Sequence, residues 1–489
     1  MLNYIKDEAN IAYTENGAVT NKSTLSDCLD LFSTIGAMRA LSEDEIIKRF
    51  MRAYAENADI AMKILFFARD VRGGLGERRV FRIIIAWLAE NHPDSLRKNV
   101  ELISEYGRFD DLLCLMNTAC ERDAVRIIIR RLNEDMADKA GNVSLLAKWL
   151  PSVNASNAQT VHNAKLIARY LGMTDEKYRK TLVKLRKKLR IIENDLREKN
   201  YTFDYEKQPS GAMFKYRKAF IRNDQERYLD YLSAVNIGEK KLNTGNIAPY
   251  EIVRAAIDPH SGFNYDLSGQ ERASLNASWN ALEDFSDGKN ALAVVDTSGS
   301  MYFNDDARPA AVALSLGMYF AQRNKGAFHN HFIEFSEHPA LIEIKGKTFT
   351  EQVEYMCSFN EIADTNIEAV LDLILNAAVR GRVPQSELPE RLYIISDMEF
   401  NACVSNASAT VFDNAKSKYK AKGYRLPEIV FWNVASRNRN QPVTKNEQGV
   451  ALVSGCSPRL FSMVTRGDFT PYSVMMDIIE SERYSGISA

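Results

Sequence analysis

The spacing of apolar residues changes once along this chain of 489 residues, and the change divides it into two parts that must fold differently. From about Ser23 to about Trp279, apolar residues recur every three or four positions, as at Ile60, Ile64 and Phe67, which is the spacing of one helix face. Turn residues interrupt this pattern at short intervals. The sequence therefore predicts an all-α region of short paired helices, similar to a HEAT-like helical repeat.

Short apolar runs replace the helical spacing after a polar stretch at residues 284–289. We expect strands near 291–296, 331–336, 340–344, 391–396, 428–434 and 450–454, and helices near 307–323, 366–379, 411–421, 457–464 and 472–482. Buried strands that alternate with helices predict a doubly wound α/β sheet, with one antiparallel hairpin at 332–344 across the turn at 337–339. The expected domains are residues 1–285, all-α, and residues 286–489, α/β and Rossmann-like.

The composition excludes a disordered chain and a membrane protein, because 45% of the residues are hydrophobic and 26% are charged, close to the averages for globular domains. The net charge of -1 means that any nucleic acid must be bound by a local patch. Six cysteines without a CxxC pair argue against a zinc cluster or a disulfide framework. Lys6, Asp7 and Glu8 stand where a signal peptide would be apolar, and no run reaches a membrane span of ~18 residues, so we expect a cytoplasmic protein.

Oxygen-bearing side chains follow the expected strands. Asp296, Ser298 and Ser300 come directly after the apolar run at 291–295, Asp397 follows the run at 391–396, and Thr365 precedes an expected helix. Ligands of open α/β sheets bind outside the carboxyl ends of the strands, and oxygen-only ligands suit a hard cation. The five residues therefore predict a site for a divalent cation, Mg²⁺ before Mn²⁺ or Ca²⁺. The alternative is structural, because this serine-rich segment can also serve as a turn and helix cap.

This ordered set resembles the metal-ion-dependent adhesion site (MIDAS) of von Willebrand factor A domains, in which Asp-x-Ser-x-Ser is followed by a distant Thr and a distant Asp. The resemblance implies that the hydroxyls supply neutral oxygens and that the carboxylates act directly or through water. It also implies that one position stays open for an acidic group of a protein partner.

Basic residues gather in the second half of the helical region. The segment 177–190 contains no acid and carries Lys177, Arg179, Lys180, Lys184, Arg186, Lys187, Lys188 and Arg190. Such a run can neutralise phosphates. The alternative is a solvated helix face whose charges pair with Glu193, Asp195 and Glu198.

Two smaller basic features are also candidates for phosphate contact. Arg72, Arg78 and Arg79 flank a glycine-rich loop, for which an inter-helix turn is the first interpretation and phosphate contact the second. Lys148 lies beside Trp149, a ring that can stack on a base or belong to the core.

Several strings in the helical region resemble the TROVE module of the Ro ribonucleoprotein family and, more strongly, a less-studied sister group in which helices of the same kind are joined to an A domain. The strings lie at 68–79, 106–113, 144–152, 178–186 and 208–220. The resemblance implies a ring of HEAT-like helices that binds small structured RNAs outside and threads the ends of misfolded RNAs through its hole. We therefore expect an RNA-binding protein rather than an enzyme. The alternatives are a cation-dependent protein-interaction scaffold without RNA and a metal-dependent hydrolase.

Overall fold

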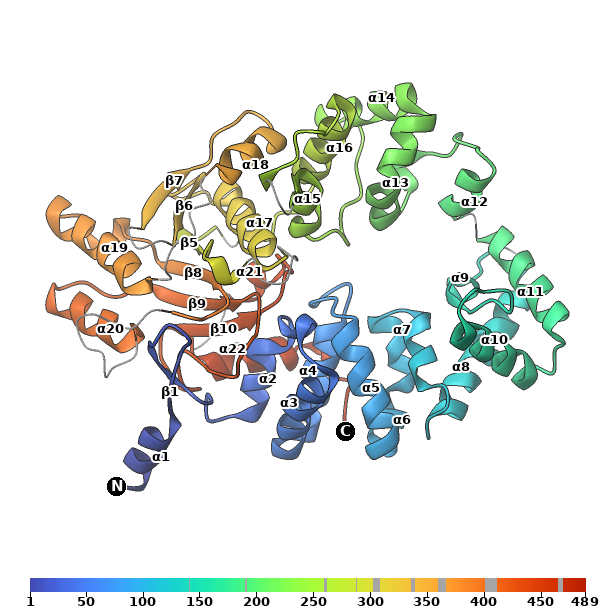
Figure 1. Ribbon diagram of the computed structural model, residues 1–489, viewed down its shortest axis with the longest axis horizontal. Coiled ribbons are helices and arrows are strands. Elements are labelled where there is room, and N and C mark those ends of the chain that lie inside the picture. The colour runs from blue at the N-terminus through green and yellow to red at the C-terminus, as the bar shows by residue number, and fades with distance from the viewer. Residues whose placement is uncertain are drawn as a thin grey trace.

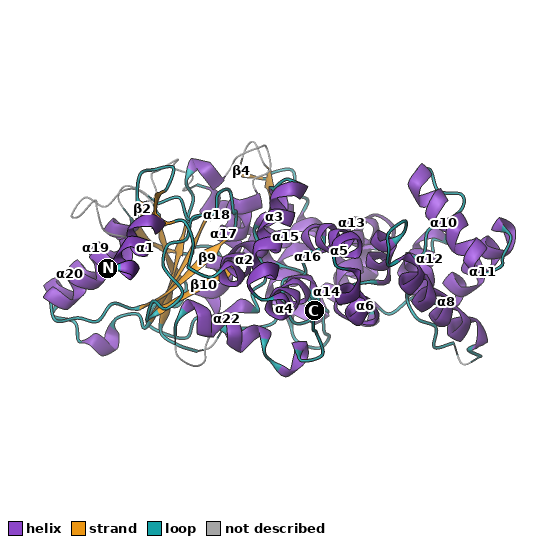
Figure 2. Cartoon of the chain, turned by 90° about the horizontal axis from the view of Figure 1, so that it is seen from below, coloured by secondary structure: helices purple, strands orange, loops and turns teal. Residues whose placement is uncertain are grey.

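The structure is a computed structural model, and it describes residues 1–139, 141–189, 191–258, 262–286, 288–301, 308–335, 339–358, 366–400, 411–464 and 469–489. Its first part is helical and its last part is a mixed, mostly parallel sheet flanked by helices (Figure 1). The strands gather towards one end of an elongated molecule, and helices α8, α10 and α11 lie at the other end (Figure 2). Among the helices that the structure describes, none is long and apolar enough to cross a membrane.

The helical region is a succession of mostly short helices. In chain order they are α2 (Asp27–Ile35), η1 (Met38–Ala40), α3 (Glu43–Glu56), α4 (Ala58–Arg69), α5 (Arg79–Asn91), α6 (Pro93–Asn99), η2 (Val100–Leu102), α7 (Ile103–Tyr106), η3 (Phe109–Leu115), α8 (Glu121–Ala137), α9 (Leu146–Trp149), α10 (Ala158–Tyr170), α11 (Asp175–Lys188), α12 (Ile192–Arg197), η4 (Tyr205–Lys207), α13 (Ser210–Asn223), α14 (Gln225–Asn236), α15 (Pro249–Ala256) and α16 (Gly269–Asn280), with η marking 3₁₀ helices. A two-residue ladder, β3 (Ile257–Asp258) with β4 (Gly262–Phe263), joins the last two helices.

Polar side chains fix where many of these helices begin. Ser42 caps α3, Asn57 caps α4 and Thr174 caps α11, each by accepting a hydrogen bond from a backbone amide in the first turn. Ser268 and Glu271 form a reciprocal capping box at the start of α16. Such caps satisfy amides that the helix itself leaves without an acceptor.

The sheet has the strand order β10-β9-β8-β5-β6-β7, and only the β6–β7 pair is antiparallel. Its strands are β5 (Ala291–Val295), β6 (His331–Glu334), β7 (Ala340–Glu343), β8 (Arg391–Ser396), β9 (Glu428–Asn433) and β10 (Val450–Ser454). Its helices are α17 (Arg308–Arg323), α18 (Phe349–Cys357), α19 (Ile367–Gly381), α20 (Val411–Ala421), α21 (Leu460–Met463) and α22 (Pro471–Ile479), with η6 (Gln385–Glu387) and η7 (Glu482–Tyr484).

The sheet is buried on both faces, as its apolar strands require. Ala293 and Val295 of β5 belong to one hydrophobic cluster, while Leu292 and Val294 belong to another. The expected strands and the antiparallel hairpin are therefore confirmed, although Glu337 and His338 of the turn expected at 337–339 lie outside the described residues. The sequence did not predict α18, and the helix expected at 472–482 ends at Ile479.

The helical region contacts the sheet domain at both of its ends. Helices α2–α7 run away from the sheet, and α13–α16 return to it (Figure 1). At the first seam the amide of Gly36 donates to Ser454 Oγ at 3.0 Å, and a Cβ at Gly36 would lie 2.4 Å from the Ser454 carbonyl oxygen. At the second seam Trp279 Nε1 donates to Gln322 Oε1 at 2.7 Å. Only glycine therefore fits at the first seam, where the two backbones nearly touch.

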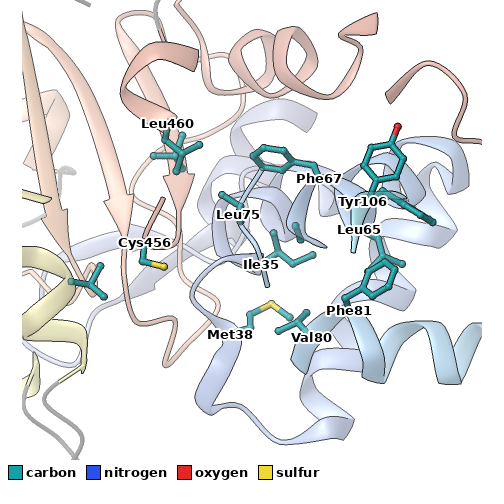
Figure 3. Close-up of a cluster of buried hydrophobic side chains, with 14 of the residues drawn as sticks. Ile35, Met38, Leu65, Phe67, Leu75, Val80, Phe81, Tyr106, Cys456 and Leu460 are labelled. Atoms are coloured by element: carbon teal, nitrogen blue, oxygen red, sulfur yellow. The ribbon is translucent and has the colours of Figure 1, made fainter. Parts of the chain in front are cut away.

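One hydrophobic core spans the first seam. Figure 3 shows Ile35, Phe67 and Leu75 of the helical region in one cluster with Cys456 and Leu460 of the sheet domain. A second cluster covers the other face of the sheet, and a third joins α12, α13 and α14. The hydrophobic core is therefore continuous across the domain boundary expected at 285/286.

Both chain ends cross between the two parts. After α1 (Leu2–Asn10), a hairpin of β1 (Ile11–Tyr13) and β2 (Val19–Asn21) lies against the sheet domain, where Asn21 forms a β-bridge with Gln441. At the other end, Arg483 Nη2 donates to Asp70 Oδ1 at 2.7 Å and the amide of Ala489 donates to Asp59 Oδ1 at 2.7 Å. Residues 482–489 therefore pack on α4 and α7, which belong to the helical region at the start of the chain.

Candidate functional site

Two buried carboxylates meet at the carboxyl edge of the sheet. Asp296 follows β5 and Asp397 follows β8, and these strands are parallel neighbours. The amide of Asp296 donates to the carbonyl of Ile395 at 3.0 Å, which fixes the two strand ends side by side. Because β6 and β8 lie on opposite sides of β5, this edge is the switch point at which open α/β sheets bind ligands.

The loop after β5 gathers hydroxyls around Asp296. The amide of Ser298 donates to Asp296 Oδ1 at 2.9 Å, and Ser396 Oγ donates to Asp296 Oδ2 at 2.6 Å. Ser298 Oγ and Ser300 Oγ lie 3.0 Å apart. Asp296 is fully buried and Ser298 nearly so. The turn thus places one carboxylate and two hydroxyls together, as the sequence predicts.

The loop after β8 presents Asp397. Its Oδ1 accepts the amide of Glu399 at 3.2 Å, and its Oδ2 lies 3.0 Å from Nη2 of Arg437. Met398 adopts a positive φ of 69°, a conformation that is costly for a residue with a Cβ. The backbone turns sharply at this point, and the Asp397 side chain is wholly buried.

Burial and the neighbouring charge of Asp397 raise the pKa of Asp296 from its usual 3.8 to about 6. Burial also raises the pKa of Glu399, and the charge of Asp397 contributes to that shift. The edge of the sheet therefore holds acids that lack sufficient positive charge. Such a set favours a cation.

The donor set fits a hard divalent cation. Two carboxylates and two hydroxyls are oxygen ligands of the kind that Mg²⁺ takes together with water. Asp397 Oδ2 is buried and lies 3.0 Å from Arg437 Nη2, but it accepts no hydrogen bond from the described residues. In the part of the chain that the structure describes, no three His, Cys, Asp or Glu side chains form a metal cluster. The serine hydroxyls would therefore supply part of the shell. Thr365, the remaining predicted ligand, lies outside the described residues.

The sequence did not predict that polar residues of the N-terminal hairpin contact the loop after β8. The amide of Glu15 donates to Glu399 Oε2 at 2.7 Å across 384 positions of sequence, and Thr14 Oγ1 donates to the Phe400 carbonyl at 2.5 Å. A signal for the hairpin itself was present, because Asn16-Gly17 is a hairpin-turn dipeptide and Gly17 has a φ of 83°. No sequence signal pointed to its docking site.

The basic candidates of α11 divide into two groups. Lys177, Arg179, Lys180, Lys184 and Lys187 are exposed, and Lys180 pairs with Glu176 at 2.7 Å. In contrast, Arg186 Nε donates to the Ala147 carbonyl at 2.8 Å and Lys188 Nζ to the Asp138 carbonyl at 2.7 Å, so both hold α11 against its neighbours.

Lys148 and Arg190 are the other basic candidates of this region. Glu193, one of the acids considered as partners of the α11 charges, pairs instead with Lys148 at 2.9 Å. Arg190 lies outside the described residues. Among the described residues, the exposed basic face of α11 therefore consists of the first group.

The glycine-rich loop joins α4 to α5, and its amides are already used. Those of Leu75 and Glu77 donate to the carbonyls of Phe67 and Ala68 at 3.2 and 2.6 Å. A Cβ at Gly74 would lie 2.0 Å from the Phe67 carbonyl oxygen. The loop closes the end of α4, and this use explains its glycine content.

The three arginines of this loop also have contacts within the protein. Arg78 pairs with Asp110 at 2.6 Å, Arg79 Nη1 donates to the Leu41 carbonyl at 2.8 Å, and Arg72 bonds the Glu105 carbonyl. Their side chains remain exposed.

A family model described as a domain of unknown function, DUF2828, matches residues 14–134 and 123–285, more than half of the chain. The chain belongs to the DUF2828 family. In this DUF2828 protein a second model of unknown function, DUF7788, matches residues 290–477. A relative, Uncharacterized protein L728 of Acanthamoeba polyphaga mimivirus, is 28% identical over 516 residues, which cover 96% of this chain and 88% of that protein.

Two solved structures are similar to this DUF2828 protein. The Ro (RSR) protein of Deinococcus radiodurans is 14% identical, with a TM-score of 0.49, over 94% of this chain and 100% of that chain. Proximal thread matrix protein 1 of the mussel byssus is 14% identical, with a TM-score of 0.27, over 40% of this chain and 49% of that chain. Likenesses at this distance transfer no function to the chain.

Proposed function

We propose that this DUF2828 protein binds non-coding RNA, either small and structured or misfolded, through its helical region and a divalent cation, by preference Mg²⁺, through its sheet domain. Mn²⁺ and Ca²⁺ are the alternative ions. The sheet domain is on this proposal a von Willebrand factor A-type domain, with Asp296, Ser298, Ser300, Thr365 and Asp397 as its MIDAS.

The convergence of Asp296 and Asp397 at one sheet edge supports the cation part. Two buried carboxylates on neighbouring strands repel each other, and burial together with the charge of Asp397 raises the pKa of Asp296. A divalent ion would remove that repulsion and complete its shell with Ser298, Ser300 and water. One open position could then take an acidic group of a protein partner.

The exposed basic face of α11 supports the RNA part. Lys177, Arg179, Lys184 and Lys187 project from one helix, and among the described residues no ion pair is formed by Lys184 or Lys187. Charges without internal partners can neutralise phosphates at no cost to the fold. The sequence segments that resemble the Ro family also support RNA binding. We further propose that the helices are HEAT-like and that the sheet domain closes them into a ring, because both ends of the helical region contact it.

The test is a fluorescence-anisotropy titration of the full chain with a structured RNA that carries a single-stranded tail, at two salt concentrations. We expect affinity to fall with salt, and the double variant Lys184→Glu/Lys187→Glu to bind about tenfold or more weakly at low salt. The matched control is Lys207→Glu/Lys240→Glu, with the same charge change at exposed lysines outside α11.

Absence of binding at both salt concentrations would refute the RNA part. It would favour the second candidate, a cation-dependent protein-interaction scaffold, because the carboxylate pair that supports the cation does not depend on RNA. On either outcome we propose a binding protein rather than an enzyme.

A further inference from the structure

One guanidinium lies between two carboxylates that come from opposite ends of the chain. Arg437 Nη2 is 3.0 Å from Asp397 Oδ2, and Arg437 Nη1 is 3.2 Å from Glu15 Oε2. The Asp397 side chain is fully buried, whereas 57% of the Glu15 side chain is exposed. The arginine therefore joins a candidate cation ligand to an acid at the surface.

The N-terminal hairpin holds Glu15 in this position. The amide of Glu15 and the side chain of Asn16 donate to the side chain and the carbonyl of Glu399, both at 2.7 Å. Glu399 lies two residues after Asp397, on the same loop. The hairpin is thus bound to the loop that presents the carboxylate, and Glu15 stays within reach of Arg437 when that loop is in place.

Arg437 and a divalent cation would compete for the same oxygen. Asp397 Oδ2 is the atom that contacts the guanidinium, and a cation bound by Asp296 and Asp397 would lie within a few ångströms of that charge. Like charges at this separation repel strongly where water is excluded. A cation can bind tightly only if the guanidinium transfers its contact from Asp397 to another acid, and Glu15 already contacts its other terminal nitrogen.

We propose that Arg437 is a built-in competitor of the cation for Asp397, and that Glu15 of the N-terminal hairpin is the acid that takes the guanidinium when the cation binds. This inference rests on the proposed cation site and adds its regulation. The hairpin, more than 370 residues from Asp397 in sequence, then sets the affinity of the site, and any partner that moves the hairpin changes that affinity.

The experiment is isothermal titration of the full chain with Mn²⁺ alone, for the wild type and three variants. We expect Arg437→Gln to bind Mn²⁺ about tenfold more tightly, because a repelling charge is removed. Glu15→Gln should bind about threefold more weakly, because the guanidinium loses its second acid. Arg439→Gln is the matched control, since Arg439 follows in the same loop but pairs with Glu45, and its affinity should equal that of the wild type.

Weaker binding by Arg437→Gln would make Arg437 a positioning residue for Asp397 and overturn the proposal. Unchanged binding by both Arg437→Gln and Glu15→Gln would also overturn it. A wild type that gives no Mn²⁺ isotherm would refute the cation site itself, and the regulation with it. Thermal melting of each variant establishes that it is folded, and Glu15→Gln alters an exposed side chain.

Discussion

The protein buries acids in two regions and supplies them with positive charge very differently. At the junction of α4, α5 and η3, the buried Asp111 accepts from Arg69 Nε at 2.8 Å and from Arg82 Nε at 2.6 Å. At the sheet edge, Asp296 has only hydroxyl and amide donors among the described residues, and Asp397 shares one guanidinium with Glu15. The first cluster is complete within the chain, and the second is short of positive charge. A structural acid and a ligand-binding acid can thus be told apart by whether the fold provides their counter-charge.

The largest expected effect lies in the complete cluster. Arg69→Ala should lower the free energy of unfolding by about 3–5 kcal/mol, because it leaves Asp111 buried with part of its counter-charge removed. Urea unfolding measures this loss. The control is Arg78→Ala, at the exposed rim of the same cluster, where we expect about 1 kcal/mol or less. Equal losses of unfolding free energy in the two variants would contradict this account, because the burial of an arginine would then not determine how much its ion pair stabilises the fold.

The next effect belongs to the incomplete cluster. Mg²⁺ at about 100 times its Kd should stabilise the wild type by about 2.7 kcal/mol, since a ligand that binds only the folded state stabilises it by mass action. A melting curve with Mg²⁺ against one with EDTA measures the shift. Asp397→Asn should lose the shift while remaining folded. If Asp397→Asn keeps the full Mg²⁺-dependent shift in melting, Asp397 is not a ligand of the cation.

The smallest effect concerns an acid at the seam between the two parts. Hydrogen bonds from Arg439, with a contribution from Arg49, lower the pKa of Glu45 from 4.5 to about 2. Because the folded pKa is depressed, this stabilisation is present above pH 4.5 and is lost as the pH falls towards 2. We expect about 1 kcal/mol or less, because the pair is partly exposed.

Urea midpoints of the wild type and of Glu45→Gln should therefore differ at pH 6 and converge as the pH falls below 4. A difference that stays constant over this range would show that Glu45 acts by packing alone.

The sequence predicted the parts of the site that depend on local order. Buried apolar runs indicated β5 and β8. Because parallel strands have their carboxyl ends at one edge of the sheet, Asp296 and Asp397 were expected to lie close together. Ser298 and Ser300 followed from their spacing. The helical region was equally readable, because its apolar residues follow one period.

The contacts between distant segments could not be predicted. Nothing in the sequence around Glu15 or Arg437 indicates that they meet, because their contact depends on how the hairpin docks on a loop hundreds of residues away. The same holds for Arg483, whose pairing with Asp70 attaches the C-terminus to the helices. The basic run at 177–190 is visible in the sequence, but only the packing of α11 shows that Arg186 bonds backbone carbonyls.

The most direct test of the central claim, that the acids at the sheet edge bind a divalent cation, is Mn²⁺ binding by the wild type and by Asp296→Asn, followed by electron paramagnetic resonance of free Mn²⁺. The account predicts one Mn²⁺ per wild-type chain, displaced by Mg²⁺, and none in Asp296→Asn, which should melt no lower than the cation-free wild type because a buried charge has been removed. Equal Mn²⁺ binding by both proteins, or no binding by the wild type at millimolar Mn²⁺, would contradict it.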